Sequence, residues 1–372
     1  MKVNWRLIHG ARNSYAALYA ACEREGFILS PVRLPADDIT CYSLNSVTEP
    51  AFRSEIRNAD CITIAGGPHA TARYREVSSY ADYVIVGEGE YTLPRLLADL
   101  DAGGSGKVPG VATTGGYVPA ESSVWLDAYP CFSKMKGYVE ISRGCPFTCG
   151  YCQTPWIFGQ CMRHRSIDAI AQYANRFEHA RFVTPNAFAY GSDGVHPRFD
   201  KIRRLLTRLN HQIFLGTFPS EVRPEFVCDT SLELITQYCD NSRLHFGAQS
   251  GSNAVLERIN RGHTVEDVVR AVELCCDHGL TPVVDVILGF PFETDEDQLA
   301  TVRLIKWVTG HGAVHVHHFM PLPGTLLEDT VARPVPAKTA QLLGKLALSG
   351  KLTGSWSESE IRFFRRPSHD IP

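Results

Sequence analysis

Short apolar runs alternate with amphipathic helical patterns along most of the 372-residue chain. In the first part of the chain, strands are predicted at residues 3–8, 27–32, 61–65 and 83–86, with helices at residues 14–25, 51–58 and 93–100. Strands that alternate with helices pair in parallel and are joined by right-handed crossovers. We therefore expect an open, doubly wound α/β sheet, whose ligands bind beyond the carboxyl ends of the strands.

The alternation returns after residues 101–119, which are rich in Gly, Thr, Ser and Pro and predict a loop or loose hairpin at a domain boundary. Strands are then predicted at residues 138–142, 181–184, 213–217, 244–248, 283–288 and 314–319, with helices at 166–177, 199–209, 231–238, 264–278 and 295–308. Six strand–helix units indicate a curved parallel sheet, a partial (β/α)6 barrel with its active site on the loops after the strands. The expected domains are residues 1–125, 126–333 and a C-terminal extension at 334–372.

The composition indicates an ordinary globular protein, since 44% of the residues are hydrophobic and 21% are charged. The formal net charge of -3 gives no global basic field, so nucleic acid is not indicated, although a local basic patch remains compatible with the sequence. The first ten residues do not resemble a signal peptide, and no run reaches the roughly 18–20 apolar residues of a membrane span. We expect a cytoplasmic protein that does not bind a membrane, in which twelve cysteines favour metal binding or catalysis over disulfides.

Three of these cysteines, Cys145, Cys149 and Cys152, form a CxxxCxxC pattern in a loop directly after a predicted strand. Thiolates are the natural ligands of iron–sulfur clusters. Three of them on a four-iron cluster would leave one iron open to a chelating molecule. The alternative is a structural zinc site with Cys161 or His164 as a fourth ligand, although structural zinc favours paired CxxC or Cys/His groups.

The CxxxCxxC pattern, with an aromatic residue before its third cysteine, resembles the radical S-adenosylmethionine (SAM) superfamily. The resemblance implies a [4Fe–4S] cluster on the three cysteines, with SAM bound to the open iron through its amino and carboxylate groups. It also implies reductive cleavage of SAM to methionine and a 5′-deoxyadenosyl radical, with Tyr151 near the adenine. An electron donor such as a flavodoxin or a ferredoxin would then be a partner.

Further stretches between residues 138 and 325 follow later strands and resemble the methylthiotransferase branch of that superfamily. The resemblance implies SAM contacts from these stretches, namely from Asn186, Tyr190, Ser220, Glu221, Arg223, Gln249, Ser250, Ile287 and Gly289. Within PSEVRP, Ser220, Glu221 and Arg223 would hold the ribose and the carboxylate, because a guanidinium group pairs well with a carboxylate. A helix N-cap with a surface ion pair is the alternative for this segment.

Two glycine-containing segments of the first domain, GGPHAT and GEGE, resemble the cobalamin-binding domain fused to many radical SAM enzymes, a flavodoxin/Rossmann-like sheet. The resemblance implies cobalamin contacts from Gly66, Gly67, Pro68, His69, Gly87, Glu88, Gly89 and Glu90. Glycines after parallel strands would let a flat macrocycle approach the backbone. The DxHxxG motif is absent, so cobalamin would bind without a protein histidine ligand. Alternatively, the two glutamates cap the following helix, and the histidine is an exposed loop residue.

The leading functional hypothesis is a cobalamin-dependent radical SAM methyltransferase that acts on an unactivated carbon of an unidentified substrate. The second is a methylthiotransferase-like enzyme that acts on RNA or protein without cobalamin. Such enzymes carry a second cluster on three N-terminal cysteines, and Cys22, Cys41 and Cys61 occur here in a different sequence context. The third is a non-catalytic iron–sulfur or zinc protein. His315 and His317, which alternate on a predicted strand, would line the substrate pocket or join His311 and His318 at a second metal.

Overall fold

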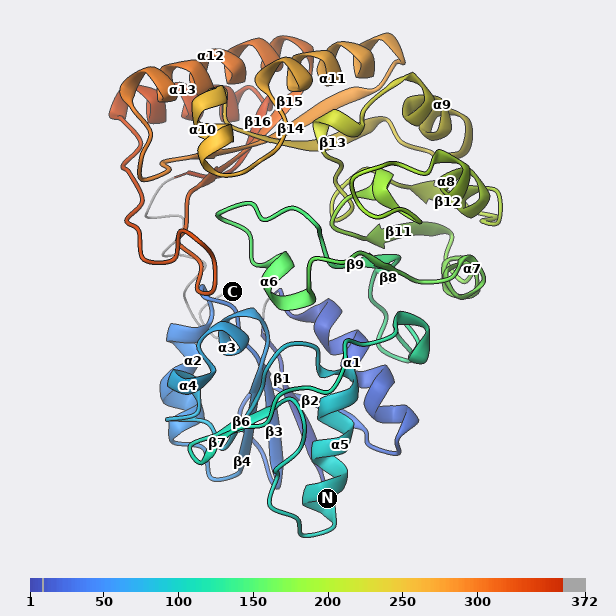
Figure 1. Cartoon of the computed structure of the whole chain (residues 1–372), viewed down its shortest axis with the longest axis vertical. Coiled ribbons are helices and arrows are strands. Elements are labelled where there is room, and N and C mark those ends of the chain that lie inside the picture. Colours follow the sequence, from blue (N-terminus) through green and yellow to red (C-terminus); the bar gives the residue numbers. More distant parts are fainter. Residues whose placement is uncertain (9, 357–372) are drawn as a thin grey trace. The chain divides into compact units, whose positions relative to one another are not determined.

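The computed structural model describes residues 1–8 and 10–356, which divide into two compact units (Figure 1). The first unit comprises Met1–Tyr138 together with Trp156–Phe158. The second comprises Val139–Pro155 and, of the described residues, 159–356. Within the described residues, no helix is long and apolar enough to cross a lipid bilayer.

The first unit is built on a seven-stranded sheet with the order β2-β1-β3-β4-β5-β6-β7. Its strands are β1 (Val3–Arg6), β2 (Leu29–Val32), β3 (Ile39–Ser43), β4 (Ile62–Gly66), β5 (Tyr83–Ile85), β6 (Val111–Thr113) and β7 (Gly116–Tyr117). The first five strands pair in parallel, whereas β6 and β7 form an antiparallel hairpin. This hairpin confirms the loose hairpin predicted within residues 101–119.

Helices pack on both faces of this sheet because successive strand residues point to opposite sides. Ile64 and Ile85 lie in one core with α1 (Arg12–Arg24) and α5 (Gly89–Asp101). Ala65 and Val84 lie in a second core, which includes residues of α2 (Glu49–Arg57), α3 (Pro68–Ala72) and α4 (Tyr74–Val77). The doubly wound fold is therefore confirmed.

Strand β3 escaped the sequence analysis because ITCYS mixes polar with apolar residues and follows two aspartates. All five of its residues are buried, since it lies inside the sheet between β1 and β4. With β3 in this place, the parallel strands have the order β2-β1-β3-β4-β5. The chain therefore adds β2 on one side of β1 and the later strands on the other side, so the direction of the connections changes between β1 and β3. Such a reversal opens a crevice at the carboxyl ends of the strands, where doubly wound proteins bind ligands.

The second unit is a partial barrel of parallel strands, as predicted. One sheet has the order β12-β11-β8 and another the order β13-β14-β15-β16, and a bridge from Val222 to Phe246 of β13 lies between them. The strands are β8 (Val139–Glu140), β11 (His179–Val183), β12 (Gln212–Phe214), β13 (Arg243–Gln249), β14 (Thr281–Leu288), β15 (Ala313–His318) and β16 (Leu352–Ser355). The strand predicted at residues 138–142 is interrupted, and its continuation β9 (Ser142–Arg143) pairs antiparallel with β10 (Arg163–His164).

Helices cover the outer face of the barrel strands, and Figure 1 shows α11, α12 and α13 lying along the sheet β13–β16. The helices of this unit are α7 (Ile167–Ala174), α8 (Phe199–Leu206), α9 (Asp229–Tyr238), α10 (Asn253–Arg258), α11 (Val265–Asp277), α12 (Asp295–His311) and α13 (Ala337–Leu348). Thr264 and Thr294 begin α11 and α12 with reciprocal capping boxes, which satisfy backbone N–H groups at each helix start. The sequence analysis missed β16, a short LTGS segment whose pairing with β15 extends the sheet.

The sharpest backbone requirement in the first unit falls on Gly67, which follows β4. Its φ angle is +93°, and a Cβ atom there would lie 2.7 Å from the carbonyl oxygen of Leu44. Gly87, which follows β5, has a similar φ of +87°, but a Cβ atom there would meet nothing within 4 Å.

We therefore expect Gly67→Ala to destabilise the protein more than Gly87→Ala. Both variants introduce left-handed backbone strain of about 1–3 kcal/mol, and only the first adds a clash with rigid backbone. Thermal unfolding of the two variants, followed side by side by circular dichroism, measures the difference. Equal losses in Tm would contradict the clash.

Candidate functional site

The three cysteines of the CxxxCxxC pattern lie in a loop that the structure closes by backbone contacts. Gly144 begins the loop with φ +86°, and a Cβ atom on it would lie 2.3 Å from the carbonyl oxygen of Cys161. The amide of Cys145 donates to the carbonyl oxygen of Gly159 at 3.1 Å. The loop therefore folds back on the segment that leads to β10.

The three thiols lie close enough to influence one another. Burial raises the pKa of Cys145, and the neighbouring Cys152 and Cys149 raise it further. Cys149 is buried, whereas the other two thiols are half-buried. Among the described residues, no three Cys, His, Asp or Glu side chains are grouped to hold a single metal ion. In a cluster site each cysteine binds a different iron, so its sulfurs lie farther apart than around one ion.

The alternative zinc site lacks a suitable fourth ligand at His164. Nδ1 of His164 lies 2.9 Å from the hydroxyl of Ser142 and accepts from the amide of Gly191. Its Nε2 lies 2.7 Å from the carbonyl oxygen of Ser192. Both ring nitrogens are thus engaged within the protein. The other suggested ligand, Cys161, is exposed.

Two arginines place positive charge beside the buried thiol of Cys149. Nη1 of Arg223 lies 3.9 Å and Nη1 of Arg261 lies 3.7 Å from its sulfur. Both guanidinium groups therefore lie within reach of an anionic ligand bound beside this sulfur. The sequence resemblance had assigned Arg223 to SAM, whereas Arg261 was not singled out.

The guanidinium of Arg223 is largely occupied by protein groups. It pairs with Glu225 at 2.5 Å, stacks 3.5 Å above the ring of Phe147 and also donates to the carbonyl oxygen of Arg261. Arg261 donates to the carbonyl oxygen of Gly247 at 2.9 Å, but its Nε is buried without a hydrogen-bond partner in the described chain. Of the two arginines, Arg261 therefore retains a donor for a bound molecule.

Two more buried polar atoms, which have no partner among residues 1–8 and 10–356, lie just beyond neighbouring barrel strands. They are Nδ2 of Asn186, which follows β11, and Oγ1 of Thr217, which follows β12. Buried polar atoms in proteins are nearly always hydrogen-bonded, so such atoms call for a polar ligand. Asn186 was predicted as a SAM contact, and Thr217 was not singled out.

Three hydroxyl groups predicted to contact SAM form hydrogen bonds within the protein. Ser220 donates to the carbonyl oxygen of Thr217 at 2.8 Å, and Tyr190 donates to that of Arg165 at 2.8 Å. The hydroxyl of Ser250 lies 3.2 Å from that of Thr301 on α12. In this structure these side chains shape the loops that carry the site.

An apolar group lies at the carboxyl end of β14 and includes Tyr151, predicted to lie near the adenine, and Ile287, predicted to contact SAM. Tyr151 and Ile287 pack against one core, whose members include Phe290 and Ile259. The ring centroids of Tyr151 and Phe290 are 6.0 Å apart. The backbone turn after Ile287 depends on Gly289, which has φ +89° and would place a Cβ atom 2.5 Å from the carbonyl oxygen of Arg333. The structure thus brings the two predicted residues together on one apolar surface.

Gln249 and Glu221 are the remaining predicted SAM contacts. Gln249 has φ +69°, and its amide occupies the space where a Cβ atom of Gly247 would lie. The backbone next to Glu221 runs beside β13, since the amide of Val222 donates to the carbonyl oxygen of His245.

The four histidines near β15 do not converge on one point. Nδ1 of His315 lies 2.7 Å from the hydroxyl of Thr353, and its ring meets His317 edge to face. His318 interacts with the carbonyl oxygen of Arg333, and His311 with that of Trp307. His315 and His317 therefore share one face of the sheet, whereas His318 and His311 make local structural contacts.

In the first unit, the predicted cobalamin contacts follow β4 and β5. His69 is 8% exposed, so the interpretation as an exposed loop residue was wrong. Its Nδ1 lies 3.2 Å from the hydroxyl of Ser46, and its Nε2 lies 3.9 Å from the buried carboxylate of Glu49. These contacts hold the ring within the domain. Gly66 is the last residue of β4, and Gly67 and Pro68 begin α3, which carries His69.

A pocket of about 320 Å³ lies beyond β5, beside Gly87, Glu88 and the start of α5. Residues 120–124 form another wall, where Glu88 accepts the amide of Val124 at 2.8 Å. Gly89 and Glu90 form the first turn of α5. The glutamate therefore anchors the pocket wall instead of capping the helix, because no side-chain cap occurs at this helix start.

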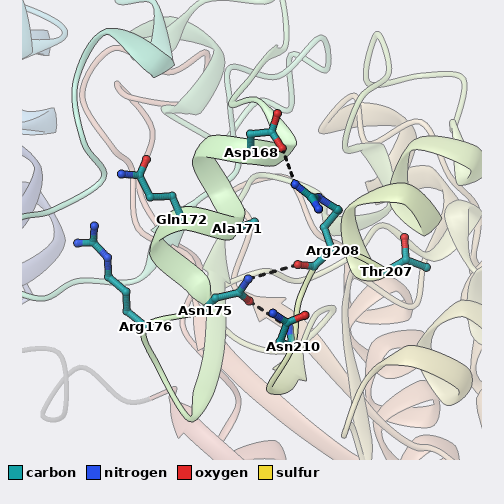
Figure 2. A pocket seen from close by; sticks show the side chains of 8 residues that line it. All are labelled: Asp168, Ala171, Gln172, Asn175, Arg176, Thr207, Arg208 and Asn210. Carbon is teal, nitrogen blue, oxygen red and sulfur yellow. Dashed lines mark hydrogen bonds and ion pairs between the residues drawn. The ribbon is translucent and has the colours of Figure 1, made fainter.

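A second pocket, of about 660 Å³, lies between α7 and the segment after α8 (Figure 2). Asp168 pairs with Arg208 at 3.1 Å, and Asn175 donates to the carbonyl oxygen of Arg208 and accepts the amide of Asn210. None of the residues predicted to bind a cofactor lines it. Its polar groups largely satisfy one another, so we place the chemistry at the cysteine loop.

Comparison with known proteins agrees with this site. Residues 139–305 match the model of the radical SAM superfamily. This region contains the cysteine loop, both arginines and β8 to β14. Residues 139–305 are therefore a radical SAM domain.

Curated relatives in sequence are tRNA-2-methylthio-N(6)-dimethylallyladenosine synthases. That of Bacteroides fragilis is 28% identical over 294 residues, which cover 74% of this chain and 61% of that protein. That of Finegoldia magna is 31% identical over 215 residues, which cover 54% of this chain and 45% of that protein. The chain thus spans about half of the length of the relatives it matches.

Solved structures of similar fold are cobalamin-containing radical SAM enzymes. The methyltransferase TsrM of Kitasatospora setae, solved with cobalamin and a [4Fe–4S] cluster, superposes with a TM-score of 0.65 at 16% identity, covering 88% of this chain and 74% of TsrM. The cobalamin-dependent enzyme OxsB, solved with aqua-cobalamin and SAM, gives a TM-score of 0.63 at 16% identity, covering all of this chain and 57% of OxsB. At such identities the likeness shows the fold, which extends over both units.

We expect Cys145→Ala, Cys149→Ala and Cys152→Ala each to abolish stable cluster binding. Full-length protein reconstituted anaerobically should bind about four irons per chain, as a four-iron cluster requires, and the variants far less. Cys161→Ala serves as the matched control and should bind iron as the parent does, because this thiol is exposed and outside the loop. Iron lost equally in the control would contradict the three-cysteine assignment.

We also expect a pH-dependent contribution to stability from Glu293, which is 4% exposed and accepts the amide of Gly289 at 3.0 Å. Burial raises the pKa of Glu293 from its usual 4.5 to about 7. Between these values the folded chain holds a proton that the unfolded chain does not, so stability falls as pH rises from 4.5 through 7. Glu293→Gln keeps an oxygen acceptor but does not titrate, so its Tm relative to the parent should rise over this range.

Glu293→Leu provides the companion measurement. It removes the acceptor, leaves the amide of Gly289 unsatisfied and should cost about 1–3 kcal/mol at every pH. Identical pH profiles for the parent and Glu293→Gln would show that this carboxyl does not titrate in the folded protein.

Proposed function

We propose that this chain is a cobalamin-dependent radical SAM enzyme that transfers a methyl group to an unactivated carbon of its substrate. The observation that carries the proposal is the joining of a doubly wound unit, with a pocket at its strand ends, to a radical SAM domain. TsrM and OxsB, which were solved with cobalamin, share this fold over 88% and 100% of the chain.

The residues present fit a cluster and SAM. Cys145, Cys149 and Cys152 would hold the cluster, which when bound supplies the electron that cleaves SAM. Arg261 has its Nη1 3.7 Å from the sulfur of Cys149, and its buried, unpartnered Nε can pair with the SAM carboxylate. Asn186 and Thr217 offer polar atoms for the rest of SAM, and the apolar surface around Tyr151 would exclude water from the adenine.

The first unit fits a corrin bound without an axial histidine. Gly87 leaves open space above the end of β5, and the adjoining pocket can accept part of a large ligand. His69, the histidine in the GGPHAT segment, is buried beside Glu49 and is not directed outward to a metal. When bound, cobalamin supplies a carrier for the methyl group.

A methylthiotransferase-like activity is the second candidate, favoured by the curated relatives, which are tRNA methylthio-modifying enzymes. A second cluster on Cys22, Cys41 and Cys61 would distinguish it. Cys22 and Cys41 are buried in the apolar core of the first unit, and burial raises the pKa of both thiols, that of Cys41 to about 12. Protonated thiols packed in a core are poor ligands for iron, which favours the first candidate.

The test is cobalamin content. The full chain is produced anaerobically with hydroxocobalamin, its cluster is reconstituted, and bound corrin, cobalt and iron are quantified after free ligand is removed. The proposal predicts about one corrin and four irons per chain. The second candidate predicts no cobalt and about eight irons. A reconstituted cluster without corrin would overturn the cobalamin assignment.

A matched pair of variants locates the corrin. Ala120→Trp places a large side chain in the wall of the pocket beside Gly87, and should lower corrin binding at least about tenfold. Ala102→Trp, at the exposed end of α5, should bind corrin as the parent does. Equal binding by both variants would place any bound corrin elsewhere.

A further inference from the structure

Positive charge is concentrated around α8, on the outer side of the second unit. Within residues 198–208, five residues are Arg or Lys and one is acidic, although the chain as a whole carries a net charge of -3. By contrast, α11 holds four acidic residues and one arginine. Charge is thus segregated among the helices of the barrel, and the net charge of the chain conceals a local basic surface.

Three arginines of this surface are exposed and have no acidic partner. Arg203 and Arg204 lie on the exposed face of α8, and Arg176 follows the end of α7. Within residues 1–8 and 10–356, the ion pairs of this region involve other arginines. The basic patch, as we define it, comprises Arg176, Arg198, Arg203, Arg204 and Arg208.

The other two arginines of the basic patch are held only by exposed aspartates. Arg208 pairs with Asp168 at 3.1 Å, and 64% and 86% of these side chains are exposed. Arg198 pairs with Asp200 at 3.0 Å, and both of these side chains are also more than half exposed. Exposed ion pairs contribute little to stability, so an incoming anion can replace either aspartate.

A pocket of about 660 Å³ joins the two helices of the basic patch (Figure 2). Arg176 lines it from α7, and Arg208 lines it from the segment after α8. The amide of Thr207 still donates to the carbonyl oxygen of Arg203, so the helical turn continues past α8. Arg204 therefore lies about one turn from Arg208, beside the pocket.

The electrostatics of α8 do not account for the basic patch. Arg203 and Arg204 lie in its last turn, where positive charge is favourable. Arg198, however, is the N-cap residue, where positive charge is unfavourable. Arg204 and Arg208 are like charges about one turn apart, which repel each other. An anionic partner removes these unfavourable interactions.

The surroundings of the basic patch favour nucleic acid over an acidic protein as that partner. Protein interfaces bury apolar and aromatic side chains at their centre. In residues 166–176 and 198–211, no large apolar side chain is exposed. Interfaces with nucleic acid are more polar and much more positively charged. The guanidinium group also matches the geometry of phosphate.

The pocket favours a single strand of RNA. Its volume lies within the range of about 300–1,000 Å³ that is typical of ligand pockets, so it can accept an unpaired nucleotide. The side-chain amides of Gln172 and Asn210 are exposed in its wall. An amide group both donates and accepts hydrogen bonds, as does the 2′-hydroxyl group that distinguishes RNA from DNA.

We propose that the basic patch and its pocket bind a single-stranded segment of RNA. The phosphates pair with the arginines, and one nucleotide occupies the pocket, where an amide meets its 2′-hydroxyl group. The inference goes beyond the proposed function, because this binding requires neither SAM nor corrin. It involves no covalent step, and the counterions that the phosphates release drive it.

The test is fluorescence anisotropy of a labelled single-stranded RNA of mixed sequence, about 15 nucleotides long, with the cluster-reconstituted full chain. The logarithm of the association constant should fall with the logarithm of salt concentration. Its slope should be about -2 to -3.5, as about three to five phosphate contacts on a single strand require. DNA of the same sequence should bind more weakly.

A matched pair of double variants locates the binding. Arg203→Ala with Arg204→Ala should weaken binding at least about tenfold in about 0.1 M salt and make the slope shallower by about 1.4. Arg303→Ala with Lys306→Ala removes the same charge from the exposed face of α12 and should bind like the parent. Circular dichroism and iron content verify that both proteins fold and hold the cluster.

Gln172→Ala tests the pocket, because it removes an amide from the wall without changing the charge. This variant should reduce the preference for RNA over DNA and leave the salt slope unchanged. An unchanged preference would show that the nucleotide does not enter the pocket as proposed.

Four further results would overturn the proposal. They are no RNA binding at low salt, equal loss of binding in the two double variants, equal binding of RNA and DNA, and displacement of the RNA by polyglutamate at equal charge concentration. The last would assign the basic patch to an acidic protein. A chain that binds RNA but no corrin would retain this surface while failing the cobalamin proposal, so the two failures are distinguishable.

Discussion

The peptide group of Gly150, between the second and third cluster cysteines, ties the cysteine loop to two distant parts of the barrel. Its amide donates to the carbonyl oxygen of Ile259 at 2.9 Å, and its carbonyl oxygen accepts the amide of Leu327 at 3.1 Å. Ile259 lies in the segment after β13, and Leu327 lies in the segment after β15. A loop with three thiols has little structure of its own, so its shape is set by strand ends that meet only when the barrel has formed. The cluster site is in this sense a product of the whole parallel sheet.

The electrostatics of the site follow from the same convergence. The segment of Ile259, which accepts the amide of Gly150, continues into Arg261. The guanidinium of Arg261 reaches back to Cys149 and to the backbone of Gly247. Arg223 arrives from the segment after β12 and is fixed by Glu225 and Phe147. Each arginine is thus positioned by several contacts before any ligand binds, which limits the entropy lost when it meets an anion. A carboxylate beside the cluster would find its partner already in place.

The sequence predicted the two parallel sheets and the cysteine loop well, because βα alternation and CxxxCxxC are local patterns. It missed β3 and β16, whose polar residues and glycine hide strands that only sheet pairing reveals. It could assign Ser220, Ser250 and Tyr190 to a ligand only by resemblance, since nothing local showed that their hydroxyls meet protein oxygens. The roles of Arg261 and Thr217 depend on contacts between residues far apart in the chain, and no periodicity marks such residues.

The inner face of the barrel explains why substrate specificity lies beyond sequence patterns in a fold of this kind. The residues that face the helices must be apolar, and they repeat as Phe246, Val284 and Val314. Those facing inward are free of that requirement, so a carboxyl at Asp285 costs little in the fold's own packing. Its burial is nevertheless unfavourable for the charged form, which is why its pKa rises. A molecule that fills the barrel and offers this carboxyl a polar partner would lower that cost.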